Sequence, residues 1–80
     1  MKIEILNCST SEVYIANPSM CETYYHDDRV YMCLYYDEDV DLEQVRKGLR
    51  ELVIFGESSP INVTIPHNHK ILFKDCPEIY

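Results

Sequence analysis

The sequence predicts an α+β fold, in which a mostly antiparallel β-sheet of about five to six short strands carries one amphipathic helix on one face. Short segments of alternating apolar and polar residues indicate the strands, and one segment with apolar residues at helical spacing indicates the helix. Turn-forming residues separate these segments. The predicted order is β-β-β-β-α-β-β, and all of residues 1–80 form a single small domain because nothing resembles a linker.

Four strands are expected in the first half of the chain. Residues 2–6 and 12–16 alternate in polarity and are separated by a polar turn. Residues 20–26 and 29–36 flank two aspartates, which favours a tight hairpin. Both faces of the 29–36 strand are at least half apolar, so we expect it at the centre of the sheet.

The helix is expected at about residues 41–54. Its apolar side consists of Leu42, Val45, Leu49, Leu52 and Val53. Asp41 followed by Gln44 resembles a capping box at the start, and Gly56 is a suitable stop. Gly48 costs about 1 kcal/mol relative to alanine inside a helix, which suggests close packing on the sheet. After the helix, residues 61–65 and 70–74 are predicted to form a second hairpin.

The compartment is inferred from what opens the chain and from its cysteines. The first ten residues lack the long apolar run of a signal peptide, and no stretch reaches the length of a membrane span. We therefore expect a cytoplasmic protein, in the host cytoplasm if it is viral, with no membrane contact. Its four cysteines are then expected to be reduced.

The formal net charge of −7 comes from one stretch. Residues 22–43 contain eight acidic residues against Arg29 alone, and the rest of the chain is balanced. Five of the seven tyrosines lie in the same stretch. If the hairpin and helix are placed correctly, the acids form two poles about 25 Å apart, joined by a strand that bears tyrosines.

This stretch has two interpretations. Acids in turns and before a helix can serve only solubility and capping. Alternatively, the stretch is a protein-binding surface, because interfaces favour tyrosine and clustered negative charge attracts a basic partner. The predicted partner-binding residues are Asp27, Asp28, Asp37, Glu38, Asp39, Asp41, Tyr24, Tyr31, Tyr35 and Tyr36.

A basic partner inside a cell is most often a protein with a nucleic-acid-binding surface. Direct binding to nucleic acid is disfavoured, because the one basic patch, Arg46, Lys47 and Arg50, is accompanied by Glu43 on the same helix. We therefore predict a non-enzymatic binding module that blocks such a partner. In size and charge the chain resembles the small inhibitors encoded by phages and mobile elements, including anti-CRISPR proteins, although no specific motif is shared.

Two alternatives remain open. His67 and His69 form an H-x-H that could bind a metal together with His26 or a cysteine, although the cysteine spacing matches no zinc module. The other alternative is a structural homodimer closed by the tyrosine face. No cofactor is predicted, because the chain has no nucleophile elbow and no glycine-rich phosphate loop.

Overall fold

The computed structural model describes residues 1–50, 52–56 and 58–79. Its elements are β1 (Lys2–Asn7), β2 (Val13–Ala16), β3 (Met20–His26), β4 (Arg29–Tyr35), α1 (Leu42–Gly48), β5 (Val53–Phe55), β6 (Ile61–Ile65) and β7 (His69–Asp75). The predicted α+β class is confirmed, since a single short helix accompanies strands whose ladders are all antiparallel. Four strands precede the helix, as predicted, but three follow it.

The strands form two sheets, where the sequence predicted one. A three-stranded sheet has the order β2-β1-β7, and a four-stranded sheet has the order β3-β4-β6-β5. The chain passes from one sheet to the other after β2, at Asn17–Pro18, and again after β6, at Pro66. The predicted hairpin of 61–65 with 70–74 is therefore wrong: β6 pairs with β4 and β5, whereas β7 pairs with β1.

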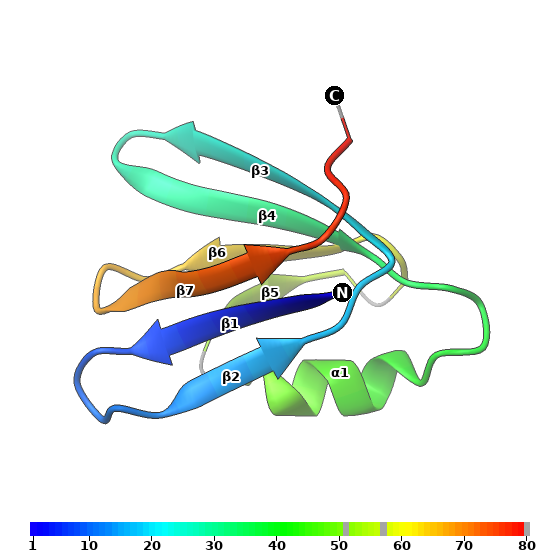
Figure 1. Ribbon diagram of the computed structural model, residues 1–80, viewed down its shortest axis with the longest axis horizontal. Coiled ribbons are helices and arrows are strands. Elements are labelled where there is room, and N and C mark those ends of the chain that lie inside the picture. The colour runs from blue at the N-terminus through cyan, green and yellow to red at the C-terminus, as the bar shows by residue number, and fades with distance from the viewer. Residues whose placement is uncertain (51, 57, 80) are drawn as a thin grey trace.

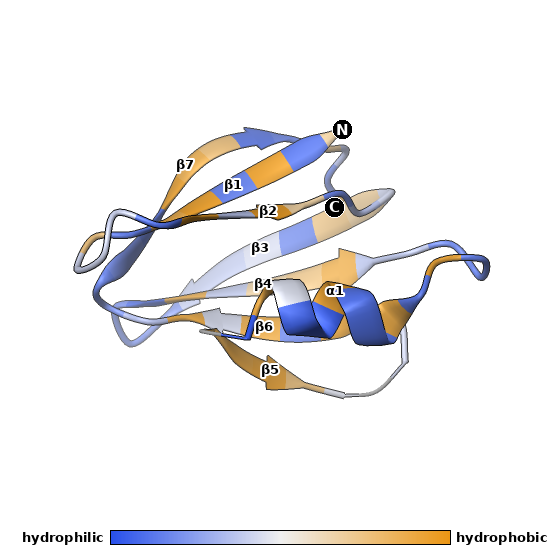
Figure 2. Cartoon of the chain, turned by 90° about the horizontal axis from the view of Figure 1, so that it is seen from below, coloured by the Kyte–Doolittle hydropathy of each residue, from blue (hydrophilic) through white to orange (hydrophobic). Residues whose placement is uncertain are grey.

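The two sheets share one hydrophobic core. Its buried side chains are Ile3, Ile5, Ala16, Cys21, Met32, Tyr36, Leu34, Leu49, Leu52, Ile61, Val63 and Ile65. They come from alternate positions of the strands, so each sheet turns one face inward and leaves the other outward. Figure 2 shows the two sheets as separate layers, with α1 beside them.

The helix is shorter than predicted. Asp41 caps it as expected, because its side chain accepts hydrogen bonds from the backbone N–H groups of Glu43 and Gln44 at 3.1 and 3.4 Å. The helix ends at Gly48, and residues 53–55 pair with β6 as an additional strand. Residue 51, within the predicted helix, lies outside the described residues. Residues 53–55 are valine, isoleucine and phenylalanine. β-branched and aromatic side chains of this kind favour a strand over a helix.

The helix also packs differently from the prediction. It lies along β2 at the side of the two-layer structure and covers no sheet face (Figure 1). Gly48 does not mark close packing, because a Cβ at this position would meet no atom within 4 Å. The outward face of the β3-β4-β6-β5 sheet is therefore left without a covering helix.

The tight hairpin between β3 and β4 is confirmed. His26 pairs with Arg29 across a two-residue turn, and Asp27 and Asp28 have φ values of 50° and 63°. These left-handed conformations are typical of the turn that connects tightly twisted hairpin strands. The hairpin projects away from the rest of the structure in Figure 1.

Candidate functional site

The candidate site is the outward face of the β3-β4-β6-β5 sheet, which we call the tyrosine face. It is defined by Glu22, Tyr24, Tyr31, Cys33, Tyr35, Phe55, Asn62 and Thr64, and Met20 and Val53 lie at its margins. In β4 the buried Met32 and Leu34 point inward, so the intervening residues point outward. The structure thus brings together three of the predicted tyrosines, Tyr24, Tyr31 and Tyr35.

Two of these tyrosines form a stacked pair. Tyr24 and Tyr31 are opposite each other in the β3–β4 register, and their ring centroids lie 5.4 Å apart at an interplanar angle of 12°. Aromatic pairs at this separation are stabilised beyond the area they bury. The pair is therefore a rigid aromatic element, with Tyr24 44% exposed to solvent.

Tyr36 does not belong to this face, which corrects the prediction. Only 9% of its surface is exposed, and it is part of the core. Its hydroxyl is buried and has no hydrogen-bond partner among the described residues, and burial raises its pKa to about 12. The residue lies just after β4, where the chain leaves the sheet, so the strict alternation of the strand no longer decides its direction.

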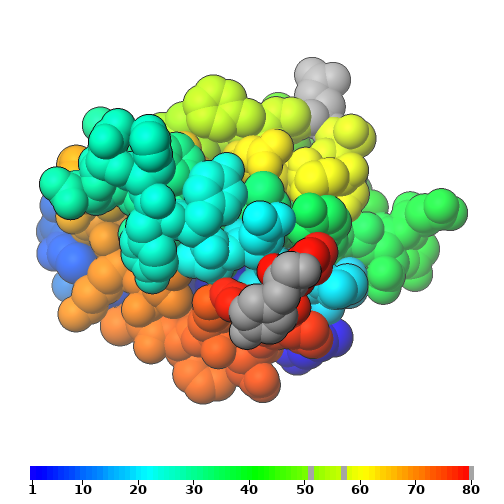
Figure 3. Space-filling model, turned by 90° about the horizontal axis from the view of Figure 1, so that it is seen from above, coloured from blue at the N-terminus to red at the C-terminus, as the bar shows by residue number. Residues whose placement is uncertain are grey.

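A shallow hollow lies in the tyrosine face. It is lined by Tyr24, Tyr31, Phe55, Asn62, Val63 and Thr64 and has a volume of about 320 Å³. The register places Tyr31 opposite Thr64 on one side of β6, and Phe55 opposite Asn62 on the other. The hollow is therefore an aromatic-sided depression above β6. Figure 3 shows the β3 side of the molecule, with β5 (lime) and the start of β6 (yellow) at the surface next to the hairpin.

Phe55 was missed by the sequence prediction. It is 57% exposed and belongs to β5. This strand was not predicted, because the preceding apolar residues have helical spacing. The signal that could have revealed it is the sequence Val-Ile-Phe at 53–55, three residues with high strand propensity directly before a glycine. That glycine, Gly56, has a φ of +91°, which ends the strand in a turn.

The predicted acidic poles lie at opposite ends of β4. Asp27 and Asp28 form the hairpin turn before the strand, and the exposed loop with Asp37, Glu38 and Asp39 follows it. The hairpin pole is partly compensated by Arg29, which directly follows Asp28 in the sequence, and His26 Nε2 lies 3.1 Å from Asp27 Oδ2. The acids of the second pole form no ion pair with any described residue. This second pole is the stronger negative centre.

Asp41 has a structural role in this second pole. Its carboxylate is occupied by the helix cap described above. A negative charge at this position also interacts favourably with the helix N-terminus. Asp41 therefore adds to the negative field while being needed for the helix.

The tyrosine face also carries a negative charge of its own. Glu22 is opposite Cys33 in the register and two residues before Tyr24 on the same face. Partial burial raises the pKa of the Cys33 thiol, and the charge of Glu22 raises it further. The Cys33 thiol also donates a hydrogen bond to Asn62 Oδ1 at 2.9 Å. The raised pKa favours the protonated thiol, which is the form that donates this hydrogen bond.

The histidines of the metal hypothesis do not converge. His67 is exposed, whereas His69 begins β7, is buried, and stacks on Tyr14 with ring centroids 6.0 Å apart. Asn68 Oδ1 lies 2.8 Å from His69 Nδ1. Within residues 1–50, 52–56 and 58–79, no three His, Cys, Asp or Glu side chains are placed to hold a metal ion.

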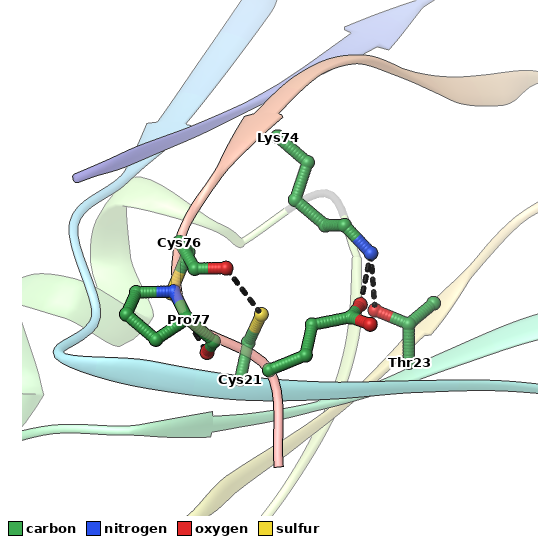
Figure 4. A network of polar contacts seen from close by, with 6 residues as sticks. Cys21, Thr23, Lys74, Cys76 and Pro77 are labelled. Atoms are coloured by element: carbon green, nitrogen blue, oxygen red, sulfur yellow. Dashed lines mark hydrogen bonds and ion pairs between the residues drawn. The ribbon is translucent and has the colours of Figure 1, made fainter. Parts of the chain in front are cut away.

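The four cysteines are free. Cys21 lies in the core at the start of β3, where its backbone pairs with that of Pro77 and Ile79 in the C-terminal tail. Its thiol faces the carbonyl oxygen of Cys76 (Figure 4). Burial and the neighbouring Cys76 raise the pKa of the Cys21 thiol to about 12. Lys74 ties the same tail to β3, since its ammonium group contacts Glu78 and lies 3.3 Å from Thr23 Oγ1. These contacts hold the C-terminal tail, which follows β7, against β3 and so connect the two sheets.

Comparison with known proteins identifies no relative. No family model matches the chain, and neither a curated protein nor a solved structure matches it. In the described part of the chain, the helix is too short and too polar to cross a membrane.

Proposed function

We propose that the protein is a non-enzymatic binding module that blocks a protein with a basic, nucleic-acid-binding surface. The observation that carries this proposal is the tyrosine face, an uncovered aromatic sheet face with an acidic pole at each end of its central strand β4. Tyrosine supplies large contact area with little loss of conformational entropy. The acidic poles accelerate the approach of a positively charged partner.

Carboxylates held at the ends of a rigid sheet can occupy a groove that normally holds phosphates. The second pole supports this role, because Asp37, Glu38 and Asp39 are exposed and have no ion-pair partner among the described residues. A defence protein of the kind that phage and mobile-element inhibitors block would be a suitable target, and it would place this protein in the cytoplasm of the host cell. Blocking requires no catalytic group.

The test compares two double variants in a capture experiment. The first variant, D37K/D39K, reverses the second pole and leaves the cap residue Asp41 intact. The control, E12K/D75K, changes the net charge equally at exposed positions on the other sheet and its loop. Tagged wild-type protein is incubated with a nuclease-treated bacterial lysate at about 0.1 M salt, where electrostatic attraction is weakly screened.

We expect the wild type and the control to capture basic proteins that added double-stranded DNA releases, and D37K/D39K to capture less than about a tenth as much. Capture that DNA does not compete, or that survives in D37K/D39K, would overturn the proposal. If the wild type captures only its own chain and light scattering shows a dimer, the tyrosine face is a homodimer interface instead.

A further inference from the structure

The hollow in the tyrosine face has the chemistry of a site for one flat, positively charged group. Its sides are the aromatic rings of Tyr31 on β4 and Phe55 on β5, with β6 beneath. Its volume of about 320 Å³ is at the lower end of the range for small-ligand sites. A whole peptide segment would not fit, whereas one long side chain would.

The floor of the hollow supplies hydrogen-bond acceptors. Asn62 Oδ1 receives one hydrogen bond from the Cys33 thiol at 2.9 Å, and a carbonyl oxygen can accept a second. Thr64, directly beside it on the floor, contributes a hydroxyl oxygen. These acceptors suit a ligand that only donates hydrogen bonds.

The electrostatics of the hollow favour a cation. None of its lining residues is charged, and Glu22 lies on the same face beside Tyr24 and Cys33. The charge of Glu22 also acts on Tyr24, which lines the hollow. Desolvation, Cys33 and Glu22 together raise the pKa of the Tyr24 hydroxyl. An anionic or acidic ligand would be repelled by Glu22 and by both poles.

We propose that the hollow receives an arginine side chain of the basic partner, with its guanidinium group stacked against Tyr31 and Phe55. This proposal rests on the proposed function and names the chemistry of its central contact. Arginine fits better than lysine because its guanidinium is planar, stacks on aromatic rings and is more weakly hydrated than an ammonium group. Lysine would satisfy the poles equally well but would gain less from the aromatic sides.

The experiment uses two synthetic peptides of identical length and charge, one with arginine and one with lysine at every basic position. Their dissociation constants for the whole protein are measured by NMR titration, in which the Asn62 side-chain amide reports on the hollow. We expect the arginine peptide to bind about fivefold more tightly, which corresponds to about 1 kcal/mol. Equal affinities for the two peptides would overturn the proposal.

Two variants of Phe55 test the role of the ring. F55A removes the side chain, and F55L keeps an apolar group without the aromatic face, so it controls for loss of folding in F55A. Both are expected to abolish the preference for arginine. The matched control is F73A on the outward face of the other sheet, where Phe73 is similarly exposed, and it should keep the preference. A preference that persists in F55L would exclude the stacking role.

The same titration separates this proposal from the proposed function. D37K/D39K should weaken both peptides by the same factor and leave their ratio unchanged, because the second pole recognises charge alone. If wild type shows no arginine preference but still captures DNA-competed proteins, only the arginine site is wrong. If the preference is present and the capture experiment fails, the hollow binds arginine but the protein does not block a nucleic-acid-binding surface.

Discussion

The outward faces of the two sheets differ although both are built from alternating strands. On the β2-β1-β7 sheet one lysine is paired with its neighbours: Lys2 Nζ lies 3.0 Å from Glu4 Oε1 and 5.6 Å from the centre of the Phe73 ring. On the tyrosine face the rings of Tyr24 and Tyr31 stack on each other, and Glu22 has no ion-pair partner among the described residues. Lys2, Glu4 and Phe73 on the first face therefore contact one another, whereas the tyrosine face leaves Glu22 and its aromatic surface open to a partner.

Exposed apolar area alone does not identify a binding face. Ile15 on the first sheet and Phe55 on the second are both about half exposed, at 53% and 57%. What separates them is the surrounding chemistry: Phe55 lines a hollow together with the rings of Tyr24 and Tyr31, whereas the hollow beside Ile15 lies between β2 and α1 and is lined mainly by aliphatic and amide side chains. Single exposed apolar residues are ordinary on protein surfaces.

The largest effect on stability is expected from changes in the hydrophobic core that the two sheets share. Leu34→Ala on the second sheet and Ile5→Ala on the first each remove a side chain that is 1% exposed, so each should lower the free energy of unfolding by about 2–5 kcal/mol. Urea denaturation followed by circular dichroism and tyrosine fluorescence should show one transition in both variants. The exposed Ile15→Ala serves as the control with little change. Separate transitions for the two probes would mean that the sheets do not form one cooperative core.

A smaller effect is expected from the aromatic contacts of the two outward faces. A double-mutant cycle of Tyr24→Ala and Tyr31→Ala should give a coupling of about 0.5–1.5 kcal/mol. The corresponding cycle of Lys2→Met and Phe73→Ala should give about 0.5–1 kcal/mol. Only the second coupling should weaken in about 1 M salt, because screening acts on the cation and not on the stacked rings. Equal salt dependence in both cycles would remove the distinction between the faces.

The tail that joins the sheets should make stability depend on pH. The hydrogen bond from Lys74 lowers the pKa of Glu78 below its ordinary value of 4.5, and it raises the pKa of Lys74 above 10.5. The stabilisation by Glu78 is therefore present above about pH 4.5 and lost as the pH falls through its lowered pKa. Glu78→Gln should lower the urea midpoint at pH 7, and its difference from wild type should narrow as the pH is taken stepwise to 3. A difference that stays constant with pH would contradict the ion pair.

The smallest effect should appear in the reactivity of Cys33. Its pKa is raised above 9.0 by partial burial and by Glu22, so Glu22→Gln should lower this pKa and modestly accelerate alkylation at pH 8. Glu22→Asp keeps the charge and should leave the rate near that of wild type. Alkylation can be measured by mass spectrometry of the Cys33 peptide. An unchanged alkylation rate in Glu22→Gln would show that the charge of Glu22 does not determine the electrostatic potential at the tyrosine face.

Much of the local structure could be predicted from the sequence. The strands at 2–6 and 20–26, the Asp27-Asp28 hairpin turn and the Asp41 cap follow from periodicity and from the backbone preferences of nearby residues. These features depend on interactions over a few residues. The separation of the two acidic poles was predictable for the same reason, because one strand lies between them.

The C-terminal half of the helix could not be predicted in this way. Leu49 and Leu52 are buried, as the helical spacing required, yet they lie beyond the last helical residue. Residues 53–55 satisfy their backbone by pairing with β6, a strand that follows them in sequence. The helical spacing therefore predicted correctly that Leu49 and Leu52 are buried, but not their secondary structure, since several backbone conformations can bury the same side chains.

The sequence by itself determined the α+β class, the hairpin turn, the helix cap and the confinement of the excess charge to residues 22–43. Only the tertiary structure decided the division into two sheets, the burial of Tyr36 and the meeting of Phe55 with Tyr24 and Tyr31 around one hollow. The physical reason is the range of the interactions. Turns, caps and charge counts depend on neighbours in the chain, whereas the hollow requires that Tyr31 and Phe55, 24 positions apart in the sequence, lie on strands that pair with the same strand, β6.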